Sequence, residues 1–165
     1  MDIRDANSDD LDAITHIYNQ YIATRTIEWT ERLHTIEGRE AWLEAKQRAG
    51  RPVLVAELEG VVVGVGTYDD FRDSMSREGY RFTVEHSVHV AEAAQSHGVG
   101  RSLVLALIER ARSDGLHAMI GAIDGENPES VAFHEQLGFV EVGRLPEIGS
   151  KLGRWLDLVL VQKLL

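Results

Sequence analysis

The sequence contains no cysteine, which excludes disulfide bonds, thiolate metal sites and a cysteine nucleophile. Basic residues are also few: 17 Lys and Arg stand against 27 Asp and Glu, and the formal net charge is −10. A protein that binds nucleic acid without regard to sequence needs a net basic surface, so this balance argues against that class. A site for an anionic ligand would have to be built locally, from backbone N–H groups and a few arginines.

Long hydrophobic runs are absent as well. No apolar stretch approaches the ~20 residues that a membrane span needs, and the charged first ten residues lack the apolar core of a signal peptide. The 165 residues suffice for a sizeable core, and no repeat or linker divides them. We therefore expect a single cytoplasmic domain over residues 1–165 that binds neither a membrane nor nucleic acid.

Hydrophobic periodicity predicts helices and strands in mixed order. Ser8 or Asp9 is the expected cap of the first helix, and Glu59-Gly60 is a two-residue hairpin signal. The expected helices cover residues 11–22, 36–49, 101–114 and 127–136. The expected strands cover residues 3–6, 53–58, 61–68, 82–90, 117–123, 139–142 and 155–162. This order indicates an α/β fold with one mixed sheet covered by helices.

The turn at residues 93–104, AAQSHGVGRSLV, joins a predicted strand to a predicted helix. A helix N-terminus carries unpaired N–H groups and a partial positive charge, and glycines let a phosphate approach them closely. Arg101 could add a charge-assisted hydrogen bond. The turn lacks the Lys-Ser/Thr ending of a Walker loop and the third glycine of a dinucleotide fingerprint. Taken alone, it is as consistent with a plain bend as with a phosphate site.

Residues 95–100, QSHGVG, fit the pattern Q/R-x-x-G-x-G/A and resemble the pyrophosphate turn of the GCN5-related N-acetyltransferases. Residues 127–139, NPESVAFHEQLGF, resemble that family's later segment, at the family's spacing. Residues 71–72, 83–88, 133–135 and 149–157 narrow the resemblance to the phosphinothricin and methionine sulfoximine acetyltransferase branch. The similarity covers essentially the whole chain.

The resemblance implies an α/β (α+β) fold with a central mixed, mostly antiparallel sheet of about six to seven strands, flanked by about four helices. It also implies direct transfer of an acetyl group from acetyl-CoA to the primary amine of a small amino-acid-like substrate, in a homodimer. By the same resemblance, the cofactor is held by Val88, His89, Val90, Gln95, Ser96, His97, Gly98, Val99, Gly100, Arg101, Asn127 and Gln136. Asn127 could equally be a helix cap.

Two residues are candidates for proton transfer. Glu85 is the candidate base, directly or through water, although it could be a solvated strand carboxylate. His134 stands where many relatives have a tyrosine that protonates the departing thiolate, and an imidazole can do this near neutral pH. It could instead bind the cofactor or fill a cavity.

A third group is expected at the substrate: Phe71, Arg72, Tyr80, Glu85, His86, Ser87 and Trp29. Arginine suits a carboxylate, although Arg72 could be a surface charge. His86 could be a core histidine bonded to backbone, and Trp29, with Ile27, could simply pack. Lys151, Arg154 and Trp155 suit a structural turn with a dimer contact better than a substrate loop.

The remaining histidines lack metal-ligand spacing, so we expect no metal. Ser96 and His97 replace a glycine and a lysine that are common in close relatives, which suggests weaker coenzyme A binding. Residues 73–79 form an unusually long link, which weakens the assignment of one substrate. Two alternatives stay open: a non-catalytic acyl-CoA sensor, which need not keep Glu85 and His134, and an enzyme that acetylates protein amines.

Overall fold

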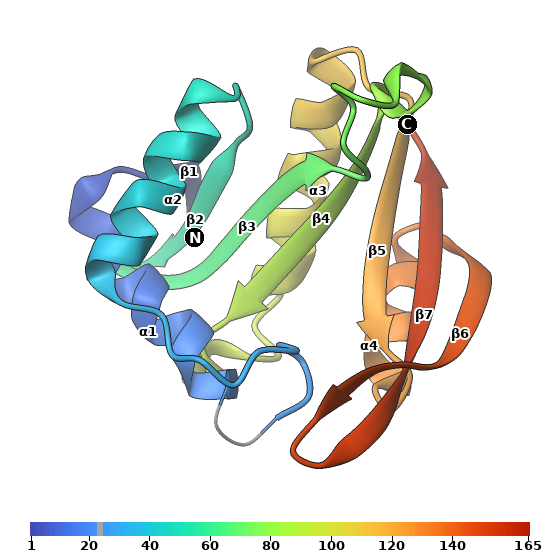
Figure 1. The fold of residues 1–165 in the computed structure, drawn as a ribbon. Coiled ribbons are helices and arrows are strands. Elements are labelled where there is room, and N and C mark those ends of the chain that lie inside the picture. Colours follow the sequence, from blue (N-terminus) through green and yellow to red (C-terminus); the bar gives the residue numbers. More distant parts are fainter. Residues whose placement is uncertain (23–24) are drawn as a thin grey trace.

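A seven-stranded sheet forms the centre of the protein, in a computed structural model that describes residues 1–22 and 25–165. The strand order is β1-β2-β3-β4-β5-β7-β6 (Figure 1). The strands are β1 (Asp2–Asp5), β2 (Val53–Leu58), β3 (Val61–Asp70), β4 (Thr83–Val90), β5 (Ala118–Asp124), β6 (Val140–Lys151) and β7 (Arg154–Leu164). The helices are α1 (Leu11–Ile22), α2 (Ile36–Arg48), α3 (Val99–Ser113) and α4 (Pro128–Gln136). Among the strands of the described residues only β4 and β5 pair in parallel, so the predicted mixed, mostly antiparallel sheet with helices around it is confirmed.

Each face of the sheet is covered by its own helices. On one face α1 and α2 pack on β2 and β3 through residues such as Ile14, Leu43 and Val65. On the other face α3 and α4 pack through residues such as Leu107 and Val131. Figure 1 shows α2 and α3 on opposite sides of the sheet. Alternate residues of β4 therefore reach different helices, because successive strand side chains point to opposite faces.

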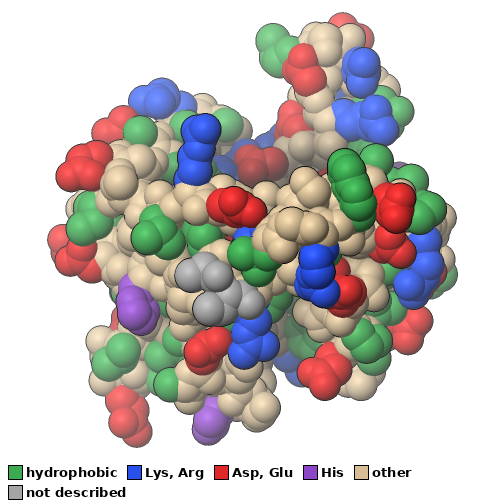
Figure 2. All heavy atoms as spheres, turned by 60° about the horizontal axis from the view of Figure 1, so that its bottom comes forward, with side chains coloured by type: hydrophobic (Ala, Val, Ile, Leu, Met, Phe, Trp, Pro, Cys, Tyr) green, Lys and Arg blue, Asp and Glu red, His purple; other side chains and the backbone are tan. Residues whose placement is uncertain are grey.

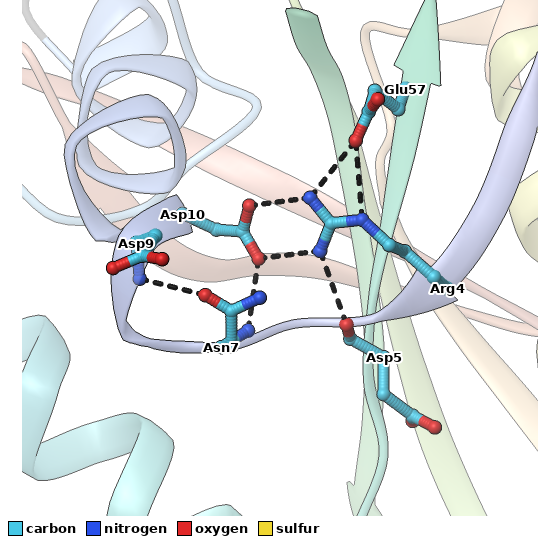
Figure 3. A network of polar contacts seen from close by, with 6 residues as sticks. All are labelled: Arg4, Asp5, Asn7, Asp9, Asp10 and Glu57. Carbon is cyan, nitrogen blue, oxygen red and sulfur yellow. Dashed lines mark hydrogen bonds and ion pairs between the residues drawn. The ribbon is translucent and has the colours of Figure 1, made fainter. Parts of the chain in front are cut away.

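The first helical segment begins with a cap that differs from the prediction. A short 3-10 turn, Ser8–Asp10, precedes α1, and its cap is Asn7, whose side chain accepts from the Asp9 N–H at 2.8 Å. Neither Ser8 nor Asp9 is the cap. Arg4 of β1 binds both Asp10, at 2.8 Å, and Glu57 of β2, at 3.0 Å (Figure 3). The arginine thereby ties the start of α1 to the edge of the sheet.

Strand β6 is much longer than the predicted 139–142. It runs to Lys151 and forms a hairpin with β7 around Leu152-Gly153, both with positive φ. Its pairing with β7 shifts between Leu145 and Gly149, so Pro146 lies in a bulge of an edge strand. An edge strand tolerates a proline there because no ladder hydrogen bond is lost. The prediction ended early because the proline and glycines of this segment are typical of loops.

The parallel pair β4 and β5 is joined over only part of its length. The register runs from Thr83 opposite Ala118 to His86 opposite Gly121 and stops there. Beyond that point β5 continues beside β7 and β4 continues beside β3. The two strands diverge, which opens the sheet between residues 87–90 of β4 and the end of β5.

Candidate active site

A cavity of about 680 Å³ lies where β4 and β5 diverge. Its walls include residues 85–90 of β4, residues 121–124 of β5, the first turn of α3 and much of α4. Two residues of the segment before α2, Ile27 and Glu28, complete the wall on the α1 side. A pocket of this size with a few convergent polar groups is typical of a small-molecule site.

The turn into α3 provides backbone donors at this cavity. Gly98, with φ of +77°, is the N-cap residue, and no side chain of the described residues caps the helix. The first intrahelical bond recorded at this end runs from Ser102 N–H to the Gly98 carbonyl. The N–H groups of Val99, Gly100 and Arg101 therefore have no partner among the described residues, and all three residues line the cavity. Uncapped N–H groups at a helix N-terminus suit a pyrophosphate, so the residues present fit acetyl-CoA.

Most of the residues predicted at the cofactor come together here. Eleven of the twelve line the cavity, and His97 is the exception. The Nδ1 atom of His97 instead lies 2.8 Å from the Gln95 carbonyl oxygen, and the residue lines a separate groove beside α1. The Gln95 side chain donates to the Tyr21 hydroxyl at 2.8 Å, which ties the turn to α1. Asn127 does cap α4, since its side chain accepts from Ser130 N–H at 3.1 Å.

Two histidines meet across the opening of the sheet. His86 projects from β4 toward α4, where its ring centroid lies 5.1 Å from that of His134. Both are buried, and neither ring nitrogen of His86 has a hydrogen-bond partner among the described residues. The alternative of a core histidine bonded to backbone is therefore wrong. Burial, and to a smaller extent the repulsion that a protonated His134 would exert, lowers the pKa of His86 to about 3, so the ring is neutral at physiological pH.

The hydrogen bonding of His134 fixes its tautomer. Its Nδ1 lies 2.7 Å from the Ser130 carbonyl oxygen, which can only accept, so Nδ1 carries the proton. Nε2 has no partner among the described residues and is an acceptor in the neutral ring. Burial lowers the pKa of His134, against the opposing effect of its bond to Ser130. In the neutral ring Nε2 can therefore accept a proton, and it can donate one only after the ring has been protonated.

Glu85 lies on the other face of β4 and also lines the cavity. Asp69 of β3 is its partner in the antiparallel register. Burial, and to a smaller extent the negative charge of Asp69, raise the pKa of Glu85. A carboxylate with a raised pKa is a stronger base than an exposed one.

Glu28 is a residue of the cavity wall that the sequence analysis missed. Its Oε1 atom lies 2.6 Å from His89 Nε2, and the His89 ring stacks on Tyr18 with centroids 4.3 Å apart. Burial acts to raise the pKa of Glu28, but the hydrogen bond and charge of His89, helped by Arg39, outweigh it and the pKa is lowered. No local pattern marks Glu28, because its partner is 61 positions away in the chain (89 − 28).

Four residues predicted at the substrate lie outside this cavity lining. Phe71 and Tyr80 pack edge to face with centroids 6.0 Å apart, and the Arg72 guanidinium lies 5.5 Å from each ring. They form their own cluster beside the start of β4. Trp29 lies against Gly149 of β6, so closely that a side chain at 149 would collide with the ring. Glu85, His86 and Ser87, by contrast, all line the cavity.

The described part of the chain holds no group of three or more histidines and carboxylates placed to bind a metal. Within residues 1–22 and 25–165, no helix combines the length and apolar character needed to cross a membrane. Figure 2 shows acidic and basic side chains interspersed over one face of the molecule, without a continuous basic patch.

Splayed parallel strands beside an uncapped, glycine-led helix define a site for an acyl-CoA in an acyltransferase. Comparison with known proteins supports this class. The acetyltransferase (GNAT) family matches residues 14–139. A curated relative from Salmonella typhimurium, an L-methionine sulfoximine/L-methionine sulfone acetyltransferase, is 44% identical over 98% of this chain and 93% of its own.

Two solved structures are similar along the chain. A ribosomal-protein-alanine N-acetyltransferase from Brucella melitensis has a TM-score of 0.96 and 45% identity, with 100% of both chains covered. A phosphinothricin acetyltransferase from Sinorhizobium meliloti in complex with acetyl-CoA has a TM-score of 0.93 and 33% identity, with 99% of this chain and 88% of the other covered. The chain belongs to the acetyltransferase (GNAT) family, as its motifs predict. It is therefore an N-acetyltransferase with acetyl-CoA as acetyl donor.

Proposed function

We propose that residues 1–165 form one N-acetyltransferase domain that acetylates the primary amine of a small amino-acid-like substrate. Phosphinothricin, methionine sulfoximine and methionine sulfone represent this class. One observation carries the proposal: a single cavity joins the unpaired N–H groups at the start of α3 to Glu85 and His134. The names of the relatives from Salmonella and Sinorhizobium support the same substrate class.

Acetyl-CoA supplies a thioester whose carbonyl carbon is open to attack by an amine. The N–H groups of Val99, Gly100 and Arg101 would bind its pyrophosphate. The main chain of residues 88–90, which β5 leaves unpaired, would receive the pantetheine arm. Asn127 keeps its role as a helix cap while the rest of its side chain faces the same cavity.

The proton transfers fall to Glu85 of β4 and His134 of α4, which lie on opposite faces of the sheet. Glu85 takes a proton from the substrate ammonium, directly or through water, so that the nitrogen can attack. His134 serves the thiolate on the other face. Because its Nδ1 is bonded to the Ser130 carbonyl, Nε2 starts without a proton. It would take the proton that the attacking nitrogen loses as the C–N bond forms, and pass that proton to sulfur as the C–S bond breaks. A sensor would need neither group at the cavity, so their presence favours an enzyme.

A protein amine is the second candidate acceptor, because the Brucella structure carries the name of a ribosomal-protein-alanine N-acetyltransferase. A small acceptor is favoured instead, because Ile27 and Glu28 add to the lining of the cavity on the α1 side and the Salmonella and Sinorhizobium relatives are named for small amino-acid-like substrates. A thiol-release assay separates the candidates. We expect acetyl-CoA turnover with methionine sulfone, methionine sulfoximine or phosphinothricin and none with peptides that begin with alanine. Coenzyme A binding without turnover on any amine would contradict the proposed function.

We also propose that the protein acts as a cytoplasmic homodimer. The edge strand β6 and the start of β7 expose Val140, Val142, Ile148 and Trp155, each more than half accessible. An exposed apolar edge of this kind is commonly covered by a partner. Light scattering should give twice the chain mass of 18.4 kDa, and Trp155→Glu should shift the protein toward the monomer.

A further inference from the structure

Lys151 is a buried lysine that none of the roles above uses. It lies near the tip of the β6–β7 hairpin with a relative exposure of 2%. Its Nζ donates to the carbonyl oxygens of Arg25 and Glu28, each at 2.5 Å. Burying a lysine amine costs free energy unless its N–H groups are hydrogen-bonded. Here the acceptors are backbone carbonyls of the segment that carries Glu28.

Two further contacts join the same hairpin to the same segment. The Leu152 N–H donates to the Glu31 carboxylate at 3.0 Å. The Trp29 ring occupies the space over Gly149 that a side chain would fill. Figure 1 shows the segment that follows the grey trace lying beside the turn of the β6–β7 hairpin. The hairpin therefore fixes residues 25–31 from outside the cavity.

These contacts between the hairpin and residues 25–31 hold the Glu28 carboxylate at a defined place. Glu28 is anchored at its carbonyl by Lys151 and at Oε1 by His89 Nε2. His89 belongs to residues 88–90, the part of β4 that β5 leaves unpaired. Glu85 and His89 project from the same face of β4, because they are four positions apart. Glu28 thus stands on the face from which an amine would reach the base, at the end of β4 where the thioester is expected.

We propose that Glu28 binds the ammonium group of the acceptor and that Lys151 is the positioning residue that holds Glu28 in place. This inference rests on the proposed function and adds a recognition group to it. The two carboxylates of this face then have separate tasks: Glu85 accepts a proton and Glu28 stays ionised. The opposite pKa shifts of the two agree with this division.

Steady-state kinetics with L-methionine sulfone and acetyl-CoA tests the proposal. Glu28→Gln should raise the KM for the amine by about tenfold to a hundredfold, since a charge-assisted hydrogen bond is lost, and change the KM for acetyl-CoA by less than about twofold. Lys151→Met should raise the amine KM in the same way. The double variant should be no worse than the more affected single variant, because both changes remove one interaction.

Lys163→Met is the matched control. Lys163 also donates to a backbone carbonyl, that of Leu137 at 3.0 Å, but it is remote from residues 25–31. It should leave the amine KM unchanged. If Lys151→Met does not fold, Glu31→Ala removes the acceptor for Leu152 N–H and should raise the amine KM in the same direction. An analogue of methionine sulfone without its amino group should inhibit Glu28→Gln and wild type equally.

The outcomes distinguish a failure of the proposed function from a failure of the inference about Glu28 and Lys151. If the wild type acetylates no amine, the proposed function fails and the inference fails with it. If the wild type is active but Glu28→Gln leaves the amine KM within twofold, the inference alone is overturned. Effects of Glu28→Gln and Lys151→Met that multiply in the double variant would overturn the role of Lys151.

Discussion

The imidazole rings of His86 and His134 are in contact, tilted by 37° to each other with centroids 5.1 Å apart. One ring comes from β4 and the other from α4, and Gly121 of β5 lies against both. The pair joins the opening of the sheet to the helix that follows β5. Because the pair is buried and neutral, protonation of a ring or an added side chain at Gly121 should destabilise the protein.

Acid should destabilise the protein through His86. Its pKa is about 3 in the folded state against 6.5 for a histidine side chain exposed to water. Between these values the unfolded chain binds the extra proton, so stability is full above about pH 6.5 and falls as the pH drops toward 3. At pH 5 the loss is about 2 kcal/mol, from ~1.4 kcal/mol per pH unit. Urea unfolding at pH 7.5 and pH 5 measures it; His86→Leu should lose less over this interval, and equal losses would contradict the assignment.

A methyl group on Gly121 should disturb the same pair. The Cβ atom of an alanine there would lie 2.9 Å from Val161 Cγ2 and 3.2 Å from His86 Nε2. We expect Gly121→Ala to cost about 1–3 kcal/mol of unfolding free energy and to lower kcat. Gly143→Ala is the control, because nothing lies within 4 Å of its added carbon. Equal stability of the two variants would show that the site can absorb the methyl group.

Glu85→Gln should lower kcat/KM by about 10²-fold or more, the usual contribution of a general base. Its deprotonated form is the active one, so wild-type activity should fall as the pH drops through its raised pKa. In the variant this acid limb should disappear. Glu109→Gln, an exposed carboxylate of α3, should leave the pH profile unchanged. An unaltered acid limb in Glu85→Gln would remove Glu85 as the base.

Ser96 adopts a backbone conformation that favours glycine, with φ of +65°. We expect Ser96→Gly to stabilise the protein by up to about 1 kcal/mol, because an L side chain is strained there. The same substitution at Ser102, which is helical in α3, should instead cost about 0.5 kcal/mol. Thermal unfolding compares the two. A loss of stability in both variants would show that Ser96 is not strained.

Local patterns predicted most of the elements because each was encoded within a few neighbouring residues. The hairpin at Glu59-Gly60 formed as expected, with both residues at positive φ. The glycine turn and the apolar stripe of α3 likewise identified the phosphate-side wall of the cavity. Most of β6 was missed because its proline and glycines are typical of loops and because the strand is exposed along most of its length, so it lacks the alternation on which strand prediction depends.

Contacts between distant segments could not be predicted in this way. Glu28 lines the cavity while it is bonded to Lys151 and His89, which come from two other segments of the chain. Trp29 was predicted at the substrate; its ring lies over Gly149 of β6, outside the cavity lining. The sequence around these residues has no periodicity, so their positions follow from tertiary contacts alone.

The divergence of β4 and β5 after His86 and Gly121 also bears on how the acceptor specificity of this protein can evolve. Peptide groups are the same whichever side chain a residue carries, so the proposed main-chain contacts of residues 88–90 to the acyl donor do not depend on the identity of those side chains. His89 faces Glu28, the proposed ligand of the ammonium group, so its replacement would change the acceptor side and leave those peptide groups in place. A new substrate could therefore arise through single replacements, without an inactive ancestor between the old preference and the new one.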